Sequence, residues 1–416
     1  MEISLANSAF ILICTALVFL MTPGLAFFYA GMERRKNALN TLMSCFFICG
    51  IASVLWVAIG YSLSFGEDHG GVIGSFGHLF FNGVGADPNE LYSSTLPETV
   101  FAAFQMMFAI ITPALICGSL VGRMKFSALF IFIIAWSVIV YYPMAHMVWG
   151  DGGFIRSLGA VDFAGGNVVH ISSGISGLVA SIMLGRRRGY GVVSYKPHNI
   201  PFVILGAGLL WFGWFGFNGG SALAADGLAA HAVMTTNTAA ATALLSWMAL
   251  EKILHGKPTV LGAATGAVVG LVAITPGAGF VPIWASFIIG AIVSPICYFT
   301  MTKIKSIFKY DDALDAFGCH GIGGIWGGIA TGLFTQKSIN PAAQWDGLLF
   351  GDTHLFVAQI LSVVITIAFA AVATFVILFV MKKLMVIRVT TEEEAQGLDI
   401  TEHSEAAYPA FTGLDQ

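Results

Sequence analysis

Long apolar stretches recur along this sequence, and no other feature constrains its fold as strongly. A transmembrane helix needs about 20 mostly apolar residues, and eleven stretches of this kind occur in the 416-residue chain. They cover residues 8–31, 41–65, 98–121, 127–149, 163–184, 200–221, 231–250, 259–276, 281–301, 313–334 and 354–381. Only helices and closed barrels satisfy their backbone hydrogen bonds in lipid. The sequence therefore predicts an all-α integral membrane protein with eleven transmembrane helices, of which the stretch 259–276 is short and glycine-rich.

The composition supports a membrane location and excludes a soluble globular domain. Hydrophobic residues make up 57% of the chain and charged residues 10%, whereas soluble domains carry about 25% charged residues. The six cysteines all lie in apolar stretches and form no CxxC pair, so we expect buried thiols rather than disulfides or a metal site. We expect no cofactor, and the partner that surrounds the chain is the lipid bilayer, not nucleic acid.

The basic residues predict the orientation of the chain. Cytosolic loops of membrane proteins carry an excess of Lys and Arg. If the N-terminus is outside, all of the 19 Lys and Arg residues except Arg156 and Lys337 lie in inner segments. No basic segment precedes the first stretch, which favours a retained helix over a signal peptide. We expect a multi-pass protein of the cell (inner) membrane with its N-terminus outside, a membrane domain at 1–385 and an acidic cytosolic tail at 386–416.

Two apolar stretches share a spacing that indicates an internal repeat. Asp162 precedes His170 by eight residues in the fifth stretch, and Asp312 precedes His320 by eight residues in the tenth. Each histidine is followed by glycines four and seven residues later, which lie on nearly the same helix face. Such glycines allow another helix to approach closely.

The positions of the two copies predict that the repeat is inverted. The copies end two units of five helices, at about 8–184 and 200–334, and an odd number of crossings gives the two units opposite orientations. The helix at 354–381 lies outside the repeat. Transporters are often built from inverted repeats, with the solute site where the repeats meet.

His170 and His320 are the deepest histidines that the repeat relates. An ionisable residue inside a membrane span is costly and indicates a function by default. Neutral core histidines are an alternative, and so is a metal site, against which the Gly, Val, Ser and Ile neighbours argue. In a narrow apolar path, two neutral imidazoles would pass a proton or hydrogen-bond a small neutral solute.

Two carboxylates lie close to these helices. Asp162 is expected to cap the fifth helix by accepting hydrogen bonds from the amides of residues 164 and 165, and its charge would also favour a nearby cation. Asp315 lies one turn inside the tenth stretch. We expect it to be a structural carboxylate at an inner vestibule.

Aromatic side chains share helix faces on several of the predicted helices. The third helix carries two phenylalanines four residues apart, the fourth ends in a tryptophan, and the sixth has an aromatic stripe that ends in a serine. These residues are Phe104, Phe108, Trp149, Trp214, Phe217 and Ser221. An aromatic face attracts a monovalent cation by about 0.5–2 kcal/mol, and stacked phenyl rings close a pore to hydrated ions. Simple packing is the alternative explanation of this pattern.

Five segments together resemble the ammonium transporter family, the Amt/Mep/Rh group, and occur in the family's order. They are "TPGLAFFYAGM", "DFAGGNVVHISSGISGLVAS", "WFGWFGFNGGSAL", "DALDAFGCHGIGGIWG" and "GLDITEHSEAAY". The similarity extends along nearly the whole chain, and it is closer to the bacterial and archaeal Amt branch than to the Rh branch.

The resemblance implies a transporter that recruits the ammonium ion outside, removes its proton and passes ammonia, with or without the proton, through a hydrophobic pore. It implies a recruitment site of Phe104, Phe108, Trp149 and Ser221 supported by Asp162, a phenyl gate of Phe108 and Phe217, and a pore lined by His170, His320 and, beside His320, Trp214. It also implies a homotrimer with one pore per subunit and, in many members, a PII-type nitrogen-regulatory protein at the cytosolic face.

Two rival functions stay open. An ammonium sensor would use the same recruitment site but conduct little, and a channel for another small neutral molecule would need no cation site at its mouth. A membrane-embedded enzyme is not expected, because the predicted spans show no nucleophile or metal cluster on facing helices.

Overall fold

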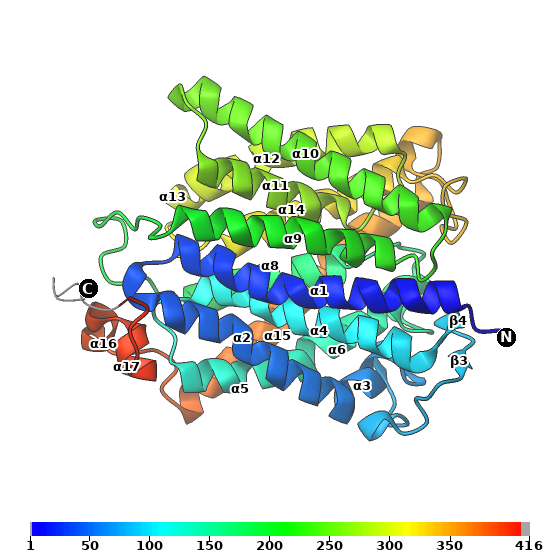
Figure 1. The fold of residues 1–416 in the computed structure, drawn as a ribbon, viewed down its shortest axis with the longest axis horizontal. Helices are drawn as coiled ribbons and strands as arrows, with labels where there is room; N and C mark the ends of the chain where they lie inside the picture. The colour runs from blue at the N-terminus through cyan, green and yellow to red at the C-terminus, as the bar shows by residue number, and fades with distance from the viewer. Residues whose placement is uncertain (1, 409–416) are drawn as a thin grey trace, which may run out of the picture.

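The apolar stretches are helices in the computed structural model, which describes residues 2–408. The crossings are α1 (Leu5–Met32), α2 with α3 (Ala38–Leu55, Tyr61–Phe65), α4 (Glu98–Leu120), α5 with α6 (Phe126–Trp136, Tyr142–Trp149), α8 (Ser172–Leu184), α9 (Ile200–Gly220), α10 (Gly227–His255), α11 (Val260–Ile274), α12 (Ile283–Phe299), α14 (Ile322–Phe334) and α15 (His354–Leu384). They run side by side between two ends of the bundle (Figure 1). Two short helices are α7 (Phe154–Ser157) and α13 (Lys305–Phe308).

Most of these crossings are long and apolar enough for a bilayer. Eight helical segments within residues 2–408 meet that criterion. The helix α11 has only 15 residues, as expected for the short eighth stretch. The helix α10 is rich in Ala and Thr and α14 is rich in Gly, so each is less hydrophobic than a helix that faces lipid all round. The prediction of an all-α, eleven-helix membrane fold is confirmed.

The two five-helix units share local irregularities, as an inverted repeat requires. The fifth and tenth crossings open with π-helical turns, at Gly166–Ile171 and Phe317–Gly321. The fourth and ninth crossings contain π-helical turns at Ser137–Tyr141 and Thr300–Ile304. A further π-helical turn at Trp56–Gly60 has no counterpart in the continuous helix α10. Such turns are rare and often mark functional sites.

The first helices of the two units pack against each other. Helices α1 and α9 are antiparallel neighbours (Figure 1), and glycines bring their backbones together. A Cβ atom on Gly206 would lie 2.3 Å from the amide nitrogen of Phe28, and one on Gly213 would lie 2.2 Å from Cγ of Met21. Small residues permit this close approach of membrane helices, so the contact between the repeats depends on glycine.

Short elements cover the two ends of the bundle. Two antiparallel hairpins, β1–β2 (Asp68–His69, Ile73–Gly74) and β3–β4 (Pro88–Asn89, Ser93–Pro97), lie in the long loop before α4. Strands β3 and β4 are at the end that holds the N-terminus, and α16 (Thr391–Gln396) and α17 (Leu398–His403) are at the opposite end (Figure 1).

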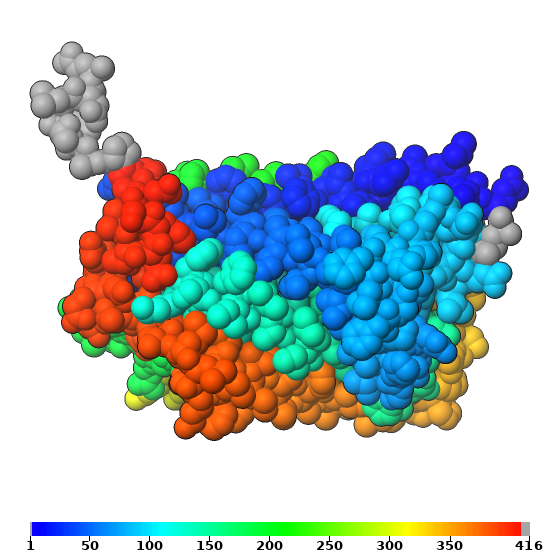
Figure 2. Space-filling view, turned by 90° about the horizontal axis from the view of Figure 1, so that it is seen from below, coloured from blue at the N-terminus to red at the C-terminus, as the bar shows by residue number. Residues whose placement is uncertain are grey.

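The described part of the tail is helical and binds the bundle. The amide of Asn40 donates to Oδ1 of Asp399 at 2.8 Å, and the amide of Leu398 donates to Oδ1 of Asn37 at 3.0 Å. Figure 2 shows this tail in red beside α15 in orange, which packs next to α5 in teal. Residues 409–416 of the tail lie outside the described part of the chain.

Candidate functional site

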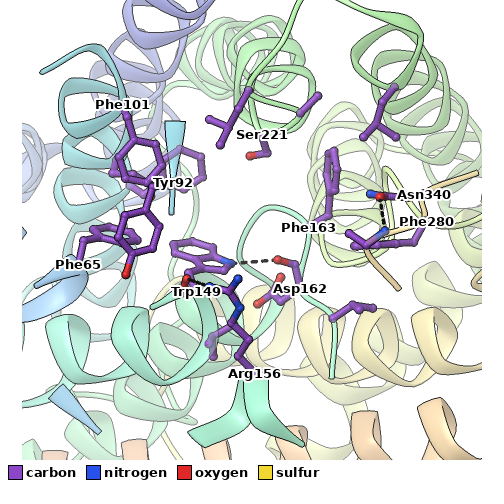
Figure 3. Close-up of a pocket in the computed structure, with 18 of the residues that line it drawn as sticks. Phe65, Tyr92, Phe101, Trp149, Arg156, Asp162, Phe163, Ser221, Phe280 and Asn340 are labelled. Atoms are coloured by element: carbon purple, nitrogen blue, oxygen red, sulfur yellow. Dashed lines mark hydrogen bonds between the residues drawn. The ribbon is translucent and has the colours of Figure 1, made fainter. Parts of the chain in front are cut away.

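A cavity of about 450 Å³ opens at the end of the bundle where β3 and β4 lie. We call it the outer vestibule, because it lies at the end of the bundle that the distribution of Lys and Arg predicts to be outside. Four of the residues predicted from the sequence line it: Phe108 on α4, Trp149 at the end of α6, Ser221 after α9, and Asp162 before the fifth crossing. Figure 3 shows Trp149, Ser221 and Asp162 around the cavity. The fold therefore brings together side chains that are more than a hundred residues apart in the sequence.

The Trp149 indole and the Ser221 hydroxyl are fixed by hydrogen bonds to the backbone. Nε1 of Trp149 donates to the carbonyl oxygen of Asp162 at 2.9 Å (Figure 3). The ring of Phe108 meets Trp149 edge-on, with centroids 5.9 Å apart. The Ser221 hydroxyl donates to the carbonyl oxygen of Phe217 at 2.8 Å, so its oxygen still has acceptor capacity.

Phe104 belongs to the predicted recruitment site, but it does not line the vestibule. Its side chain is fully buried, and its ring packs edge-on behind Phe108 at a centroid distance of 5.0 Å. Sequence reasoning missed other lining residues, namely Phe65, Tyr92, Phe101 and Arg156. Only Arg156 carried a signal, because it is one of two basic residues assigned to the outside. Its Nη1 donates to the carbonyl oxygen of Trp149 at 3.0 Å.

Below the vestibule, Phe108 and Phe217 close the path. Their ring centroids are 4.3 Å apart with an interplanar angle of 36°, and each side chain is 1% exposed. The two rings come from α4 and α9, one from each five-helix unit. A hydrated ion has no room to pass between rings in contact.

The histidines lie directly behind these two rings. The ring of His170 is 6.1 Å from that of Phe217 and 5.3 Å from that of His320. The two Nδ1 atoms of the histidines are 3.3 Å apart. Around them is a narrow lumen lined by Met, Leu, Ile and Val side chains. Its free volume is about 10 Å³.

Trp214 packs against His170, whereas the resemblance had implied a position beside His320. Its ring stacks on the His170 ring at 5.5 Å and 21°, and its Nε1 donates to Oγ1 of Thr275 at 2.9 Å. The reason is the direction of α9. Trp214 lies one turn before Phe217, so it continues inward from that ring and first meets the outer histidine.

Asp162 holds the start of the fifth crossing through four backbone amides. Its Oδ1 accepts from Gly165 and Gly166 at 2.8 and 2.6 Å, and its Oδ2 accepts from Asn167 and Val168 at 2.7 and 3.4 Å. The expected cap is present, but it uses residues 165–168 instead of 164 and 165. Gly165 has a φ of 119°, which glycine adopts readily and which turns the following amides toward the carboxylate.

The symmetry-related Asp312 has the same role at the tenth crossing. Its carboxylate accepts from the amides of Ala316 and Phe317 at 3.3 and 2.8 Å and from the hydroxyl of Ser119 at 2.7 Å. Asp315 lines an inner cavity of about 330 Å³ together with His320. Its Oδ1 is 2.7 Å from Nζ of Lys305, which makes it a structural carboxylate of that inner vestibule.

Replacement of Asp162 with Asn is expected to lower the free energy of unfolding by about 2–4 kcal/mol, because two buried amides would then face an NH2 group instead of an acceptor. Solute uptake should fall with it, since these amides position the turn that carries His170. The change is measured by thermal unfolding in detergent. The control is Asp226→Asn, because Asp226 caps the exposed start of α10 and Asn caps as well as Asp. Equal stability of the two variants would contradict this role for Asp162.

A contact between His146 and Asp68 fastens the β1–β2 hairpin to the helix that carries Trp149. Nδ1 of His146 is 3.0 Å from the carbonyl oxygen of Ser64, and its Nε2 is 2.9 Å from Oδ1 of Asp68. The hydrogen bond from His146, and then that from the amide of Gly71, hold the pKa of Asp68 below its usual value.

This pair predicts a loss of stability in acid. A depressed carboxyl pKa stabilises the fold above the unfolded-state value of about 3.9, and the contribution disappears as the pH falls through the folded-state pKa. Asp68→Asn should therefore lower the melting temperature more at pH 6 than at pH 3. Asp151→Asn, a neighbouring exposed carboxylate, is the control. A melting-temperature difference that stays constant over this pH range would show that the contact contributes nothing.

The fold and the site together define a class of protein. An inverted helical repeat encloses, in order, an outer vestibule, a pair of phenyl rings in contact, a narrow apolar lumen with two histidines and an inner vestibule. This is the architecture of a multi-pass membrane protein that carries a small solute. The chain matches the family described as the Ammonium Transporter Family over residues 9–408, and it belongs to that family.

Similar proteins agree with this assignment. The chain is 50% identical over 404 residues to an ammonium transporter of Bacillus subtilis, covering 97% of this chain and 98% of that protein. It is 45% identical over 403 residues to the ammonium transporter Amt1 of Archaeoglobus fulgidus, covering 97% and 99%. The crystal structure of Saccharomyces cerevisiae Mep2 matches with a TM-score of 0.88 and 34% identity, over 94% of this chain and 89% of that one. A sensor Amt protein matches with a TM-score of 0.87 and 29% identity, over 96% and 98%.

Proposed function

We propose that this protein is an ammonium transporter that recruits the ion at the outer vestibule, removes its proton and passes ammonia through the histidine lumen. The observation that carries the proposal is the pair of imidazoles in a narrow apolar lumen behind two phenyl rings. Membership of the family and the names of the relatives, which are transporters and not enzymes, support it.

Recruitment uses the cation's charge and its four N–H donors. The faces of Trp149 and Phe108 attract a monovalent cation, and the Ser221 oxygen accepts a hydrogen bond from it. Asp162 contributes indirectly, because its carbonyl oxygen holds the Trp149 indole. Phe104 supports the ring of Phe108 from behind.

Selectivity follows from desolvation. Ammonium and potassium have similar size and the same charge, so an aromatic site attracts both. The lumen behind Phe217 offers neither ion a hydration shell, and an unsolvated ion in an apolar medium costs many kcal/mol. Ammonium avoids this cost by giving up a proton and crossing as ammonia, and potassium cannot.

The histidine pair offers ammonia one donor and one acceptor. In the contact between the two Nδ1 atoms, one ring donates and the other accepts. The donating neutral ring then has an acceptor at Nε2, and the other ring has an N–H there. Nε2 of His170 has no protein partner within residues 2–408. Ammonia can donate to one ring and accept from the other as it passes. If the pair also relays the proton, transport is electrogenic; if it only solvates ammonia, transport is neutral.

The remaining parts of the proposal concern topology and assembly. The N-terminus is outside the cell (inner) membrane, 1–385 is the membrane domain and 386–416 is a cytosolic tail. The segregation of Lys and Arg supports this orientation. The chain forms a homotrimer with one pore per subunit, and the cytosolic face with its folded tail is the surface for a PII-type regulator.

Current and uptake in proteoliposomes under an ammonium gradient test the proposal, with potassium and methylammonium as comparators. Saturable ammonium flux with no potassium flux is the expected result, and current distinguishes electrogenic from neutral transport. The similarity to a sensor Amt protein favours one alternative, an ammonium sensor; ammonium binding with negligible flux would establish it. Equal permeation by an unrelated neutral solute would instead indicate a general channel.

A further inference from the structure

A further cavity, of about 570 Å³, opens at the end of the bundle where the tail lies, beside the inner vestibule, with which it shares Met301 and Thr302. It is formed between the segment that follows α8 and the end of the ninth crossing. Its polar lining residues are Arg186, Tyr190, Thr302, Lys305, Ser306 and Lys309. Thr302, Lys305, Ser306 and Lys309 follow the i, i+3, i+4, i+7 spacing of one helix face, so the ninth crossing turns one polar face toward the cavity.

The cavity has an excess of positive charge. None of the residues that line it is acidic. Lys305 pairs with Asp315, but Arg186 and Lys309 have no carboxylate partner within residues 2–408. Two cations without a counter-ion repel each other, and an anion bound between them would remove that repulsion.

The backbone of Lys309 anchors the Arg186 guanidinium at the cavity. Nε of Arg186 donates to the carbonyl oxygen of Lys309 at 2.8 Å. Lys309 has a φ of 55°, in the left-handed region, where it ends α13. The Arg186 guanidinium lies over the Tyr190 ring, 5.7 Å from its centroid. The rim of the cavity is therefore preorganised, and Arg in particular suits the geometry of a phosphate.

Large apolar side chains are exposed next to this basic rim. Ile307 is 70% exposed, Phe308 73% and Val192 89%. Ile307 and Phe308 end the ninth membrane-crossing segment, so they lie at the level where the bilayer meets water, and Val192 lies in the loop that follows α8. A site for a soluble anion does not require exposed apolar neighbours, whereas a lipid presents a phosphate and acyl chains together.

We propose that this cavity binds the phosphate of an anionic phospholipid headgroup, held by Arg186 and Lys309, with the acyl chains against Ile307 and Phe308. Basic pockets at the cytosolic ends of membrane helices suit such headgroups. The proposed phosphate ligands Arg186 and Lys309 do not line the inner vestibule, so the proposal goes beyond transport and does not depend on which solute the path carries.

The test measures binding of phosphatidylglycerol to the purified full-length protein in neutral detergent, by native mass spectrometry at fixed ionic strength. The double variant Arg186→Gln/Lys309→Gln should weaken binding about 30-fold, at about fivefold for each cation. Lys252→Gln/Lys257→Gln is the matched control, because it removes two exposed charges outside this cavity. Melting temperatures without lipid show that both variants are folded.

Three comparisons decide the outcome. Phosphatidylcholine should bind equally to all forms, and inorganic phosphate or glycerol 3-phosphate at millimolar concentration should fail to displace phosphatidylglycerol. Efficient displacement by either soluble anion would overturn the proposal in favour of a soluble phosphate site. Equal loss of binding in the two double variants would overturn it in favour of nonspecific charge attraction.

Discussion

His170→Ala and His320→Ala are each expected to reduce ammonium flux at least tenfold or to admit potassium. Each substitution removes a ring from a lumen whose free volume is about 10 Å³. The enlarged lumen would hold several waters, which would lower the desolvation cost that excludes ions. Proteoliposome uptake of ammonium and potassium, measured side by side, distinguishes loss of conduction from loss of selectivity.

The control for this experiment is His354→Ala, because the His354 side chain is 70% exposed and lies at the start of α15, away from the path. It should transport as the unmodified protein does. If both pore variants retained full flux and full selectivity against potassium, the assignment of the lumen as the transport path would be wrong.

Gly174→Ala is expected to abolish transport and to destabilise the fold. A Cβ atom on Gly174 would lie 2.1 Å from the amide nitrogen of Gly321 and 2.4 Å from its Cα. These atoms belong to the backbone next to His320 and cannot move aside as a flexible side chain would. Overpacking of this kind costs about 1–3 kcal/mol, and relief of the clash would separate the two histidines.

The measurement is thermal unfolding together with ammonium uptake, and the matched control is Gly50→Ala. Gly50 lies inside α2, and a Cβ atom there would meet nothing within 4 Å, so helix propensity predicts a small gain in stability. Wild-type uptake by the Gly174 variant would show that the two crossings tolerate separation, and that the contact between the histidines is not required.

The site was predictable in part because the inverted repeat is visible as spacing. The eight-residue interval from aspartate to histidine occurs in both units, and each aspartate caps the helix start in the structure. The amides that Asp162 uses could not be predicted, because they depend on the left-handed turn at Gly165. The place of Trp214 against His170 was also missed, since a stripe on one helix does not reveal which residue of another helix it meets.

Other features of the vestibule and of the tail have no recognisable pattern in the sequence. The aromatic residues Phe65, Tyr92 and Phe101 line the outer vestibule, but their contribution depends on how a loop and two helices meet. Phe104 shares a helix face with Phe108 and yet lies behind it, because helical spacing specifies a face and not its depth. The tail packs on the bundle through Asp399 and Asn40, although its composition is that of a solvated segment.

The sequence by itself determined that this chain is a helical membrane protein with eleven crossings and two inverted units. Those properties follow from local quantities: hydrophobic length, because a bilayer has a fixed thickness, and the spacing of a few polar residues, because a helix has a fixed period. Only the tertiary structure decided that the two histidines lie with their Nδ1 atoms 3.3 Å apart behind a closed pair of phenyl rings. That arrangement joins residues from distant helices, and it depends on glycines whose missing side chains let those helices approach.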